Sequence, residues 1–284
     1  MNQIEKAKRF AELHVKGAPL LLYNAWDAGS AKSILEAGAK AIATSSWSVA
    51  EAQGYRDGEA IPIEFAEQIV ARIAATIDVP VTVDFEGGYS EADGELADNI
   101  ARLLDLGVIG INFEDRVVKG SGLYDVDRQA RRITAIRKAA EQKGVGLFIN
   151  ARTDLFLGQG GDPAQSVGEA LDRAKAYAAA GASGFFIPGL RDDALIGRIS
   201  EGVTLPVNVW SWTAFRQLIG CRSSESRASA TVQFRTSTRW VRFNRKRRRP
   251  CPSEGQRHND ADCLKLCSAV ANSIPETSSC AQSS

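Results

Sequence analysis

The feature that most constrains the fold of this chain is a regular alternation of short apolar runs with longer segments of helical spacing. Seven apolar, often β-branched runs alternate with such segments, and glycine-centred turns recur between them (residues 37–39, 106–108 and 143–145). Strands that alternate with helices form a parallel sheet. The even spacing, together with the lack of a glycine-rich phosphate-binding motif in the sequence, favours a (β/α)8 TIM barrel over a doubly wound sheet.

The expected elements stop short of a complete barrel. We predict strands at 20–23, 39–44, 79–85, 110–113, 147–151, 184–187 and 205–209, and helices at 2–16, 30–37, 63–77, 92–106, 127–143, 164–180 and 192–200. No eighth strand follows, so the predicted fold is an α/β TIM barrel that lacks its native eighth strand and C-terminal helices. Such a sheet has two edges with unpaired backbone groups, and we therefore expect poor stability.

Charge and cysteine content divide the chain near residue 209. Residues 1–209 contain 22 basic and 29 acidic residues, whereas residues 210–284 contain 13 basic and five acidic residues and all five cysteines. We therefore predict a catalytic barrel domain at 1–209 and a basic, cysteine-containing tail at 210–284, which is expected to be disordered because it lacks clear periodicity. No apolar run is long enough to span a membrane and no signal-peptide pattern is present, so the expected location is the cytoplasm.

Three hypotheses account for the tail. The basic run at 245–249 would be a localisation signal or a patch that binds anions or nucleic acid without sequence specificity. His258, Cys263 and Cys267 would form a partial zinc set, although their spacing matches no strong zinc pattern. The third hypothesis, which we favour, is a frameshift. Regrouping a coding sequence for residues 210–217 by one base gives M-V-M-D-G-V-P-S, and regrouping 227–236 gives R-I-S-Y-G-A-I-P-Y, which resembles a missing strand.

The stretch at 79–89 (VPVTVDFEGGY) combines a buried strand with two acids. Its uninterrupted apolar run is typical of a strand buried on both faces. Asp84 and Glu86 follow with the spacing that places side chains on one face of a strand, and Gly87 and Gly88 then turn the chain. Two acids at the end of a buried strand need a cation or hydrogen-bond donors. A divalent metal is one interpretation; a helix cap or bonds to nearby arginines is the other.

Other polar residues fall at the ends of the predicted strands. In a barrel of this kind the active site lies at the carboxyl ends of the strands. Hard carboxylate oxygens suit Mg²⁺, which keeps several waters, and a guanidinium offers a planar fork for a substrate carboxylate. Such a set suits chemistry through an enolate whose oxygen a metal stabilises. The residues at these ends are Ser45, Ser46, Trp47, Asp84, Glu86, Glu114 and Arg152.

Four segments, in this order and spacing, resemble the isocitrate lyase/phosphoenolpyruvate mutase superfamily. They are TSSWSVAEAQGYRDGE at 44–59, VPVTVDFEGGY at 79–89, GINFED at 110–115 and INARTD at 149–154, and the resemblance covers residues 1 to about 209. It implies a Mg²⁺-dependent enzyme, with Mn²⁺ as a substitute ion, that makes or breaks a C–C or P–C bond in a small α-keto or α-hydroxy carboxylic acid. It also implies a homo-oligomer built through C-terminal elements, an assembly that we doubt for a chain without them.

The resemblance assigns roles to residues at the strand ends. Asp84 would bind the metal directly, Glu86 and Glu114 would hold it through water, and Arg152 would pair with the substrate carboxylate. Ser45 and the backbone amides of Ser46 and Trp47 would hold the carboxylate and the enolate oxygen, and Asp57 matches an acid of the same site. The structural alternative for Arg152 is a salt bridge to Asp84 and Glu114.

The sequence departs from the family pattern at two positions. Glu86 replaces the second acid of the usual Asp-x-Asp motif, which keeps the charge. Gly122 stands where C–C lyases of the family carry a cysteine and phosphonate mutases an asparagine, and no thiol precedes Cys221. The usual isocitrate or methylisocitrate lyase mechanism is therefore disfavoured. Lys119 remains as a loop candidate for catalysis, with Ser121 and Tyr124 as further candidates.

These observations predict a Mg²⁺-dependent lyase that acts through a pyruvate enolate on a small carboxylic acid, with no membrane or specific nucleic-acid partner. Decarboxylation of an oxaloacetate-like acid and P–C cleavage of a phosphonate both remain open. The alternative is a catalytically dead, truncated barrel whose basic tail binds anions or nucleic acid nonspecifically.

Overall fold

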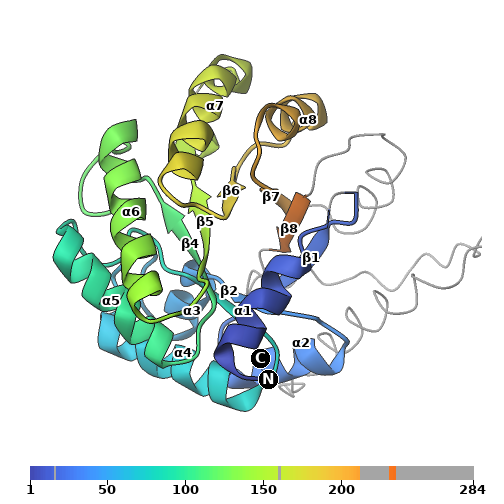
Figure 1. Ribbon diagram of the computed structural model, residues 1–284, viewed down its shortest axis with the longest axis vertical. Helices are drawn as coiled ribbons and strands as arrows, with labels where there is room; N and C mark the ends of the chain where they lie inside the picture. The colour runs from blue at the N-terminus through green and yellow to red at the C-terminus, as the bar shows by residue number, and fades with distance from the viewer. Residues whose placement is uncertain (16, 159–160, 212–229, 235–284) are drawn as a thin grey trace, which may run out of the picture.

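The computed structural model describes residues 1–211 and 230–234, apart from residues 16, 159 and 160, and only the backbone for residues 211 and 230–234. Eight parallel strands form a closed barrel in which neighbours in the chain are neighbours in the sheet (Figure 1). The strands are β1 (Leu20–Ala25), β2 (Ile42–Thr44), β3 (Val81–Asp84), β4 (Gly110–Glu114), β5 (Phe148–Arg152), β6 (Gly184–Phe186), β7 (Val207–Ser211) and β8 (Ala230–Phe234).

Helices alternate with these strands and surround the barrel. They are α1 (Gln3–Glu12), α2 (Ala28–Glu36), α3 (Ser46–Ala52), α4 (Ile63–Thr76), α5 (Asp93–Asp105), α6 (Val126–Gln142), α7 (Pro163–Ala179) and α8 (Asp193–Gly202), with a 3₁₀ turn at Asp154–Phe156. The predicted α/β barrel and its seven strands are confirmed, and Asp27 caps α2 as its position indicates. The short helix α3 is additional; it follows β2 where a loop was expected.

The eighth strand is present, so the prediction of a barrel without it is wrong. The backbone of β8 pairs in parallel with β7 on one side and β1 on the other, which closes the sheet. A seven-stranded sheet would leave N–H and C=O groups unpaired along β1 and β7, and a short extended segment in this gap satisfies them. The sequence does not indicate this run as a strand because the stretch around it is rich in Ser and Arg. The expectation that the sheet has two unpaired edges is therefore also wrong.

The other predictions for the tail lie outside the described residues. These are its disorder, the lack of C-terminal helices, the basic run at 245–249 and the partial zinc set of His258, Cys263 and Cys267. Within the part of the chain that the structure describes, no helix is both long and apolar enough to cross a membrane.

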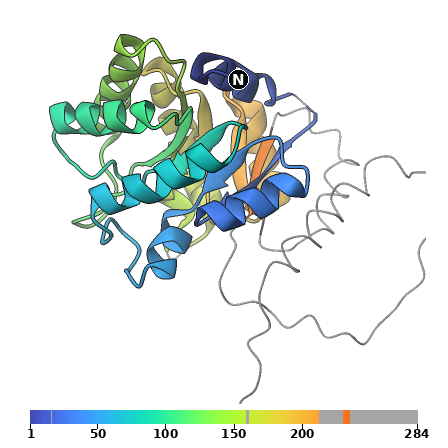
Figure 2. The ribbon, with the colours of Figure 1, turned by 90° about the horizontal axis from the view of Figure 1, so that it is seen from below.

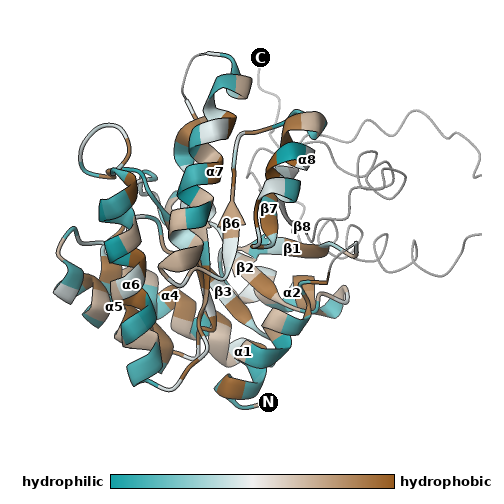
Figure 3. Cartoon of the chain, turned by 45° about the horizontal axis from the view of Figure 1, so that its top comes forward, coloured by the Kyte–Doolittle hydropathy of each residue, from teal (hydrophilic) through white to brown (hydrophobic). Residues whose placement is uncertain are grey.

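Apolar side chains fill the space between the strands and the helices. Hydrophobic positions concentrate on the strands and on the inner sides of the helices, and hydrophilic positions cover the outer sides (Figure 3). At the end where the strands begin, α1 packs against the barrel (Figure 2), with the ring of Phe10 5.2 Å from that of Phe148 and His14 stacked on Phe148 at 4.3 Å. We call Phe10, His14 and Phe148 the floor of the barrel.

Candidate active site

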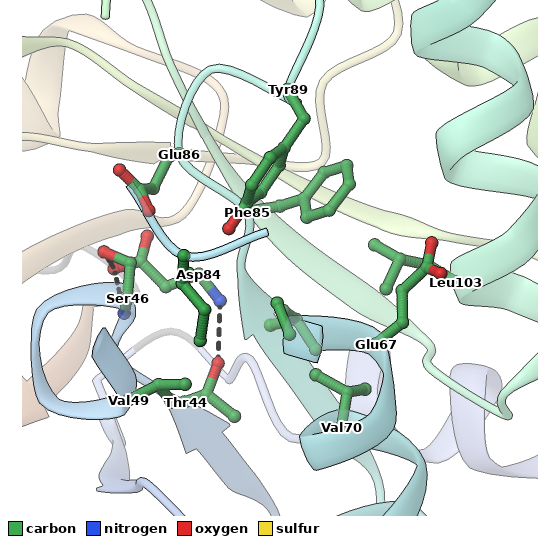
Figure 4. Close-up of a pocket in the computed structure, with 13 residues that line it drawn as sticks. Thr44, Ser46, Val49, Glu67, Val70, Asp84, Phe85, Glu86, Tyr89 and Leu103 are labelled. Carbon is green, nitrogen blue, oxygen red and sulfur yellow. Dashed lines mark hydrogen bonds between the residues drawn. The ribbon is translucent and has the colours of Figure 1, made fainter. Parts of the chain in front are cut away.

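Asp84 ends strand β3 and lies beside Ser46, the first residue of α3 (Figure 4). Its Oδ2 accepts the backbone N–H of Ser46 at 3.1 Å and the Ser46 hydroxyl at 2.9 Å, while its own N–H donates to Thr44 Oγ1 at 3.0 Å. Its Oδ1 is buried and has no hydrogen-bond partner among the described residues. The Nη1 of Arg152 lies 3.8 Å from this oxygen. Asp84 therefore offers one oxygen that is fixed and one that is open.

Glu86 is placed by a turn rather than by the strand, because β3 ends at Asp84. Glu86 and Tyr89 both have left-handed backbones, with φ of 49° and 61°. The Oε2 of Glu86 accepts the N–H of Glu59 at 2.8 Å, and its carbonyl accepts the N–H of Glu114 at 2.9 Å. Non-glycine residues keep such a conformation only where their surroundings impose it, and this often happens at functional sites. In Figure 4 the carboxylates of Glu86 and Asp84 lie on the side of Ser46.

Arg152 ends β5 and lies between carboxylates. Its Nε and Nη2 donate to Asp154 at 2.6 and 3.0 Å, and its Nη1 lies 3.0 Å from Glu114 Oε2. The face of the guanidinium lies 6.0 Å from the ring centroids of Phe186 and Trp210. A guanidinium has five N–H donors. Contacts with the described residues use three of them, which leaves one N–H on each terminal nitrogen for a ligand. We call Ser46, Asp84, Glu86, Glu114 and Arg152 the mouth of the barrel.

A buried ion-pair network supports Arg152 from behind. Asp115, which is fully buried, accepts the N–H of Asp154 at 3.0 Å through Oδ1. Its Oδ2 accepts from Arg173 at 3.1 Å and from the Tyr177 hydroxyl at 2.9 Å. Because Asp154 in turn holds two nitrogens of Arg152, the network fixes the direction of the guanidinium.

The mouth contains more carboxylates than nearby cations. Burial, followed by the charges of Asp57, Asp84 and Glu114, raises the pKa of Glu86 to about 9. Burial also raises the pKa of Glu114 to about 8, although Arg152 opposes the shift. Both pKa values lie above neutrality, so without a further positive charge these two groups hold protons at pH 7.

This donor set fits a magnesium ion. Among the described residues, no three His, Cys, Asp or Glu side chains are already arranged as a metal-binding group. Mg²⁺, however, keeps several waters and takes only one or two direct carboxylate ligands. The open, buried Oδ1 of Asp84 could serve as one such ligand, and the charges of Asp84 and Glu114 act on Glu86, so the three carboxylates belong to one cluster. The raised pKa values indicate the missing positive charge.

The other predicted site residues are placed around this cluster. Ser45 is buried and its hydroxyl accepts the N–H of Ser48 at 3.3 Å, so it caps α3. The amide of Ser46, expected to bind substrate, is used by Asp84. Trp47 is half-buried in the first turn of α3. Asp57 is exposed and accepts the Ser46 hydroxyl at 3.3 Å, which places it at the rim of the mouth.

Lys119 contacts Glu59, which in turn contacts the carboxylate cluster. Its side chain is 67% exposed, and its Nζ lies 3.8 Å from Glu59 Oε2. The loop that carries it is a hairpin closed by the bridge between Arg116 and Leu123. Gly122 in this loop has φ of 75°, and a Cβ added there would have no atom within 4 Å. The position of the family's acid/base residue is thus open space.

Sequence analysis missed the residues that support the site. Glu59, Asp154 and Asp115 each hold a predicted site residue or its neighbour. Asp154 follows Arg152 by two positions at a strand end, and this spacing is a signal for a shared face. The partners of Glu59 and Asp115 are 27 to 62 residues away in the chain, so no local pattern indicates them.

Known proteins resemble this chain over most of its length. A crystal structure from Burkholderia cenocepacia J2315, provisionally named a phosphonomutase, is 44% identical, and the match covers 81% of this chain and 93% of that one with a TM-score of 0.77. An oxaloacetate decarboxylase of Pseudomonas savastanoi pv. phaseolicola (strain 1448A / Race 6) is 33% identical over 148 residues, which is 51% of this chain and 48% of that protein.

A phosphonopyruvate hydrolase, determined in complex with oxalate and Mg²⁺, shares the fold at a TM-score of 0.69 and 19% identity, covering 82% of this chain and 78% of that one. The sequence profile of the phosphoenolpyruvate phosphomutase family matches residues 10–221, more than half of the chain. The chain therefore belongs to the phosphoenolpyruvate phosphomutase family, within the isocitrate lyase/phosphoenolpyruvate mutase superfamily of lyases and mutases that act on C–C and P–C bonds.

Proposed function

We propose that this chain is a Mg²⁺-dependent lyase that cleaves a small α-keto carboxylic acid through a pyruvate enolate. The observation that carries the proposal is the mouth of the barrel, where Arg152 lies against Asp84 and Glu114, the charges of Asp84 and Glu114 raise the pKa of Glu86, and Asp84 Oδ1 has no hydrogen-bond partner among the described residues. The phosphonopyruvate hydrolase with Mg²⁺ and oxalate supports the choice of ion and of ligand class. Mn²⁺, which accepts carboxylate oxygens in the same way, would substitute.

The charged residues of the mouth and the start of α3 have separate roles in this proposal. Asp84 Oδ1 would bind the ion directly, and Glu86 and Glu114 would hold it through water. When bound, the ion supplies stabilisation of the negative charge that develops on the substrate oxygens. Arg152 donates its two remaining N–H groups to the substrate carboxylate and is kept in place by Asp154. The Ser45 hydroxyl and the Trp47 amide, at the start of α3, bind the keto oxygen.

Within this class, we propose decarboxylation of an oxaloacetate-like acid. The C3–C4 bond breaks, its electron pair forms the enolate of pyruvate, CO₂ leaves, and C3 then takes a proton from water. No residue has to remove a proton before the bond breaks, whereas an aldol-type lyase needs a base for the substrate hydroxyl. Gly122 at the acid/base position and the lack of a thiol before Cys221 favour the reaction that needs neither. The oxaloacetate decarboxylase relative supports the same choice.

The test is release of pyruvate from oxaloacetate and from phosphonopyruvate, measured with Mg²⁺, with Mn²⁺ and with a chelator. We expect metal-dependent release above the metal-only background, and preference for oxaloacetate. Asp84→Ala should lower kcat/KM by more than about 100-fold, because loss of a direct ligand exceeds the 10- to 100-fold effect of an outer-shell partner. Asp105→Ala is the matched control, since Asp105 is an exposed carboxylate paired with Lys143. Release from neither substrate would overturn the proposal.

A further inference from the structure

Three loops meet beside the mouth at a small polar pocket. They are the connection from α3 to α4, which carries Glu59, the turn at 86–89 after β3, and the hairpin that carries Lys119. Arg132 of α6 lines the same pocket from below and donates to the carbonyls of Gly87 and Ser90. The turn that presents Glu86 is therefore held by residues that are distant in the chain.

Glu59 makes the central contacts of this junction. Its side chain is only 4% exposed. Its backbone N–H donates to Glu86 Oε2, and its Oε1 accepts the N–H of Tyr89, both at 2.8 Å. One residue thus holds the carboxylate at the start of the turn and the backbone at its end.

The turn is strained and closely packed where Glu59 touches it. Glu59, Glu86 and Tyr89 are the non-glycine residues with positive φ among those the structure describes, at 55°, 49° and 61°. A Cβ on Gly87 would lie 2.7 Å from Val118 Cγ2 and 3.0 Å from Glu59 Oε1. Three strained residues in one set of contacts need hydrogen bonds to hold them, because a left-handed backbone is unfavourable for a residue other than glycine.

We attribute the fixed position of the 86–89 turn to the hydrogen bond that Glu59 accepts from the Tyr89 N–H, rather than to the negative charge of Glu59. Lys119, whose Nζ lies 3.8 Å from Glu59 Oε2, is 67% exposed. An exposed ion pair of this length contributes little. The bond to the Tyr89 amide is short, and its acceptor is almost fully buried.

We propose that Glu59 is a positioning residue for the metal-binding mouth. Its backbone orients the Glu86 carboxylate, and its side chain, by accepting the Tyr89 N–H, keeps the 86–89 turn in the conformation that directs Glu86 toward the ion held by Asp84. The inference rests on the proposed function, because it assigns this turn to Mg²⁺ binding.

The first experiment measures hydrogen exchange of the Tyr89 amide in the unaltered chain, in Glu59→Ala and in Glu59→Gln, all without metal. Glutamine keeps the acceptor oxygen and removes the charge, whereas alanine removes both. We expect exchange about 10-fold faster in Glu59→Ala, the effect of one lost hydrogen bond, and within about twofold of the unaltered rate in Glu59→Gln. Thermal unfolding of each variant establishes that it is folded.

The second experiment measures binding of Mg²⁺ alone by titration calorimetry. We expect Glu59→Ala to raise the Kd about 10- to 100-fold, as loss of an outer-shell partner does. Glu59→Gln should restore binding to within about threefold. Glu91→Ala is the matched control, because Glu91 is an exposed carboxylate that lines the same pocket.

The outcomes separate the inference from the proposed function. An unchanged Kd and exchange rate in Glu59→Ala overturn the inference, and so does a Glu59→Gln variant as weak as Glu59→Ala, since charge would then be responsible. If the unaltered chain binds no Mg²⁺, the proposed function fails together with the metal role of Glu59. The exchange rate of the Tyr89 amide then still decides whether Glu59 holds the turn.

Discussion

The two ends of the barrel are both packed closely, yet different interactions stabilise them. At the floor, Phe10 is 1% exposed and contacts the rings of His14 and Phe148. At the mouth, Arg152 and Glu114 are buried to a similar degree, but charged groups make the contacts. The apolar floor gains free energy simply by leaving water, whereas each buried charge at the mouth costs free energy until a partner compensates it.

This difference distinguishes the end of the barrel that stabilises the fold from the end where we propose that ligands bind. Within the described residues the floor needs no additional partner, because its three rings pack against one another. The mouth is not, since Glu86 and Glu114 have pKa values raised to about 9 and about 8 and Asp84 Oδ1 has no hydrogen-bond partner there. A bound cation, such as the proposed Mg²⁺, would compensate these carboxylates, and strongly shifted pKa values of this kind often accompany functional sites.

The largest effect should come from Arg152→Met at the mouth. The substitution leaves Glu114 and Asp154 buried without their cation, and removal of one partner of a buried pair costs about 3–5 kcal/mol. It also removes the donors proposed for the substrate carboxylate, so kcat/KM should fall by more than about 1,000-fold, the loss of two charge-assisted bonds. Urea unfolding and pyruvate release measure the two effects.

The same substitution at an exposed pair serves as the control. Arg102 lies 2.8 Å from Glu67 but is 47% exposed, so Arg102→Met should change the free energy of unfolding by less than about 1 kcal/mol. A folded Arg152→Met enzyme with ordinary activity would contradict the role of the mouth.

At the floor, Phe10→Ala should affect stability but not catalysis. Truncation of a fully buried phenylalanine costs about 3–5 kcal/mol, because it leaves a cavity between α1 and β5. The kcat of the folded fraction should stay unchanged, since the mouth lies at the other end of the strands. Ile4→Ala on the same helix is the control, because Ile4 is 62% exposed and should cost less than about 0.5 kcal/mol. A large fall in kcat with an unchanged folded fraction would contradict this prediction, because it would show that the floor affects catalysis at the mouth.

The floor and the mouth also differ in how far the sequence predicts them. Apolar periodicity indicates seven strands, and parallel topology brings Asp84, Glu114 and Arg152 to one edge, because each stands at a strand end. The partners that fix these side chains come close only through the tertiary fold, so the local sequence does not indicate them. Helix α3 was not predicted because its Ser-Ser-Trp-Ser start is typical of a loop, and β8 was missed because the residues around it are rich in Ser and Arg.

The stability of the protein should depend on pH because Glu86 at the mouth titrates differently in the folded and unfolded states. Its folded pKa of about 9 exceeds the reference value of 4.5, so between these values the folded state keeps a proton that the unfolded state has lost. Without metal, stability is therefore present in full below pH 4.5 and falls as pH rises toward 9, by at most about 1.4 kcal/mol per pH unit for one group. Urea unfolding between pH 5 and 9 measures this slope.

Glu86→Gln should flatten the slope, and Mg²⁺ should stabilise the unaltered protein most at high pH, where the carboxylates bind the ion without first losing protons. Asp105→Asn, at an exposed pair, should leave the slope unchanged. An identical slope in Glu86→Gln would show that the mouth does not titrate as we infer.

The smallest effect should come from His14 at the floor, and its sign is opposite. Burial lowers the pKa of His14 below the reference value of 6.5, so below pH 6.5 the unfolded state binds a proton that the folded state does not. The floor therefore loses stability as pH falls, whereas the mouth loses it as pH rises. His14→Phe keeps a ring against Phe148 and removes the titration, so urea unfolding should reveal a shallower acid-side decline below pH 6.5 and no change above it. An altered slope above pH 7 would contradict the separation of the two ends.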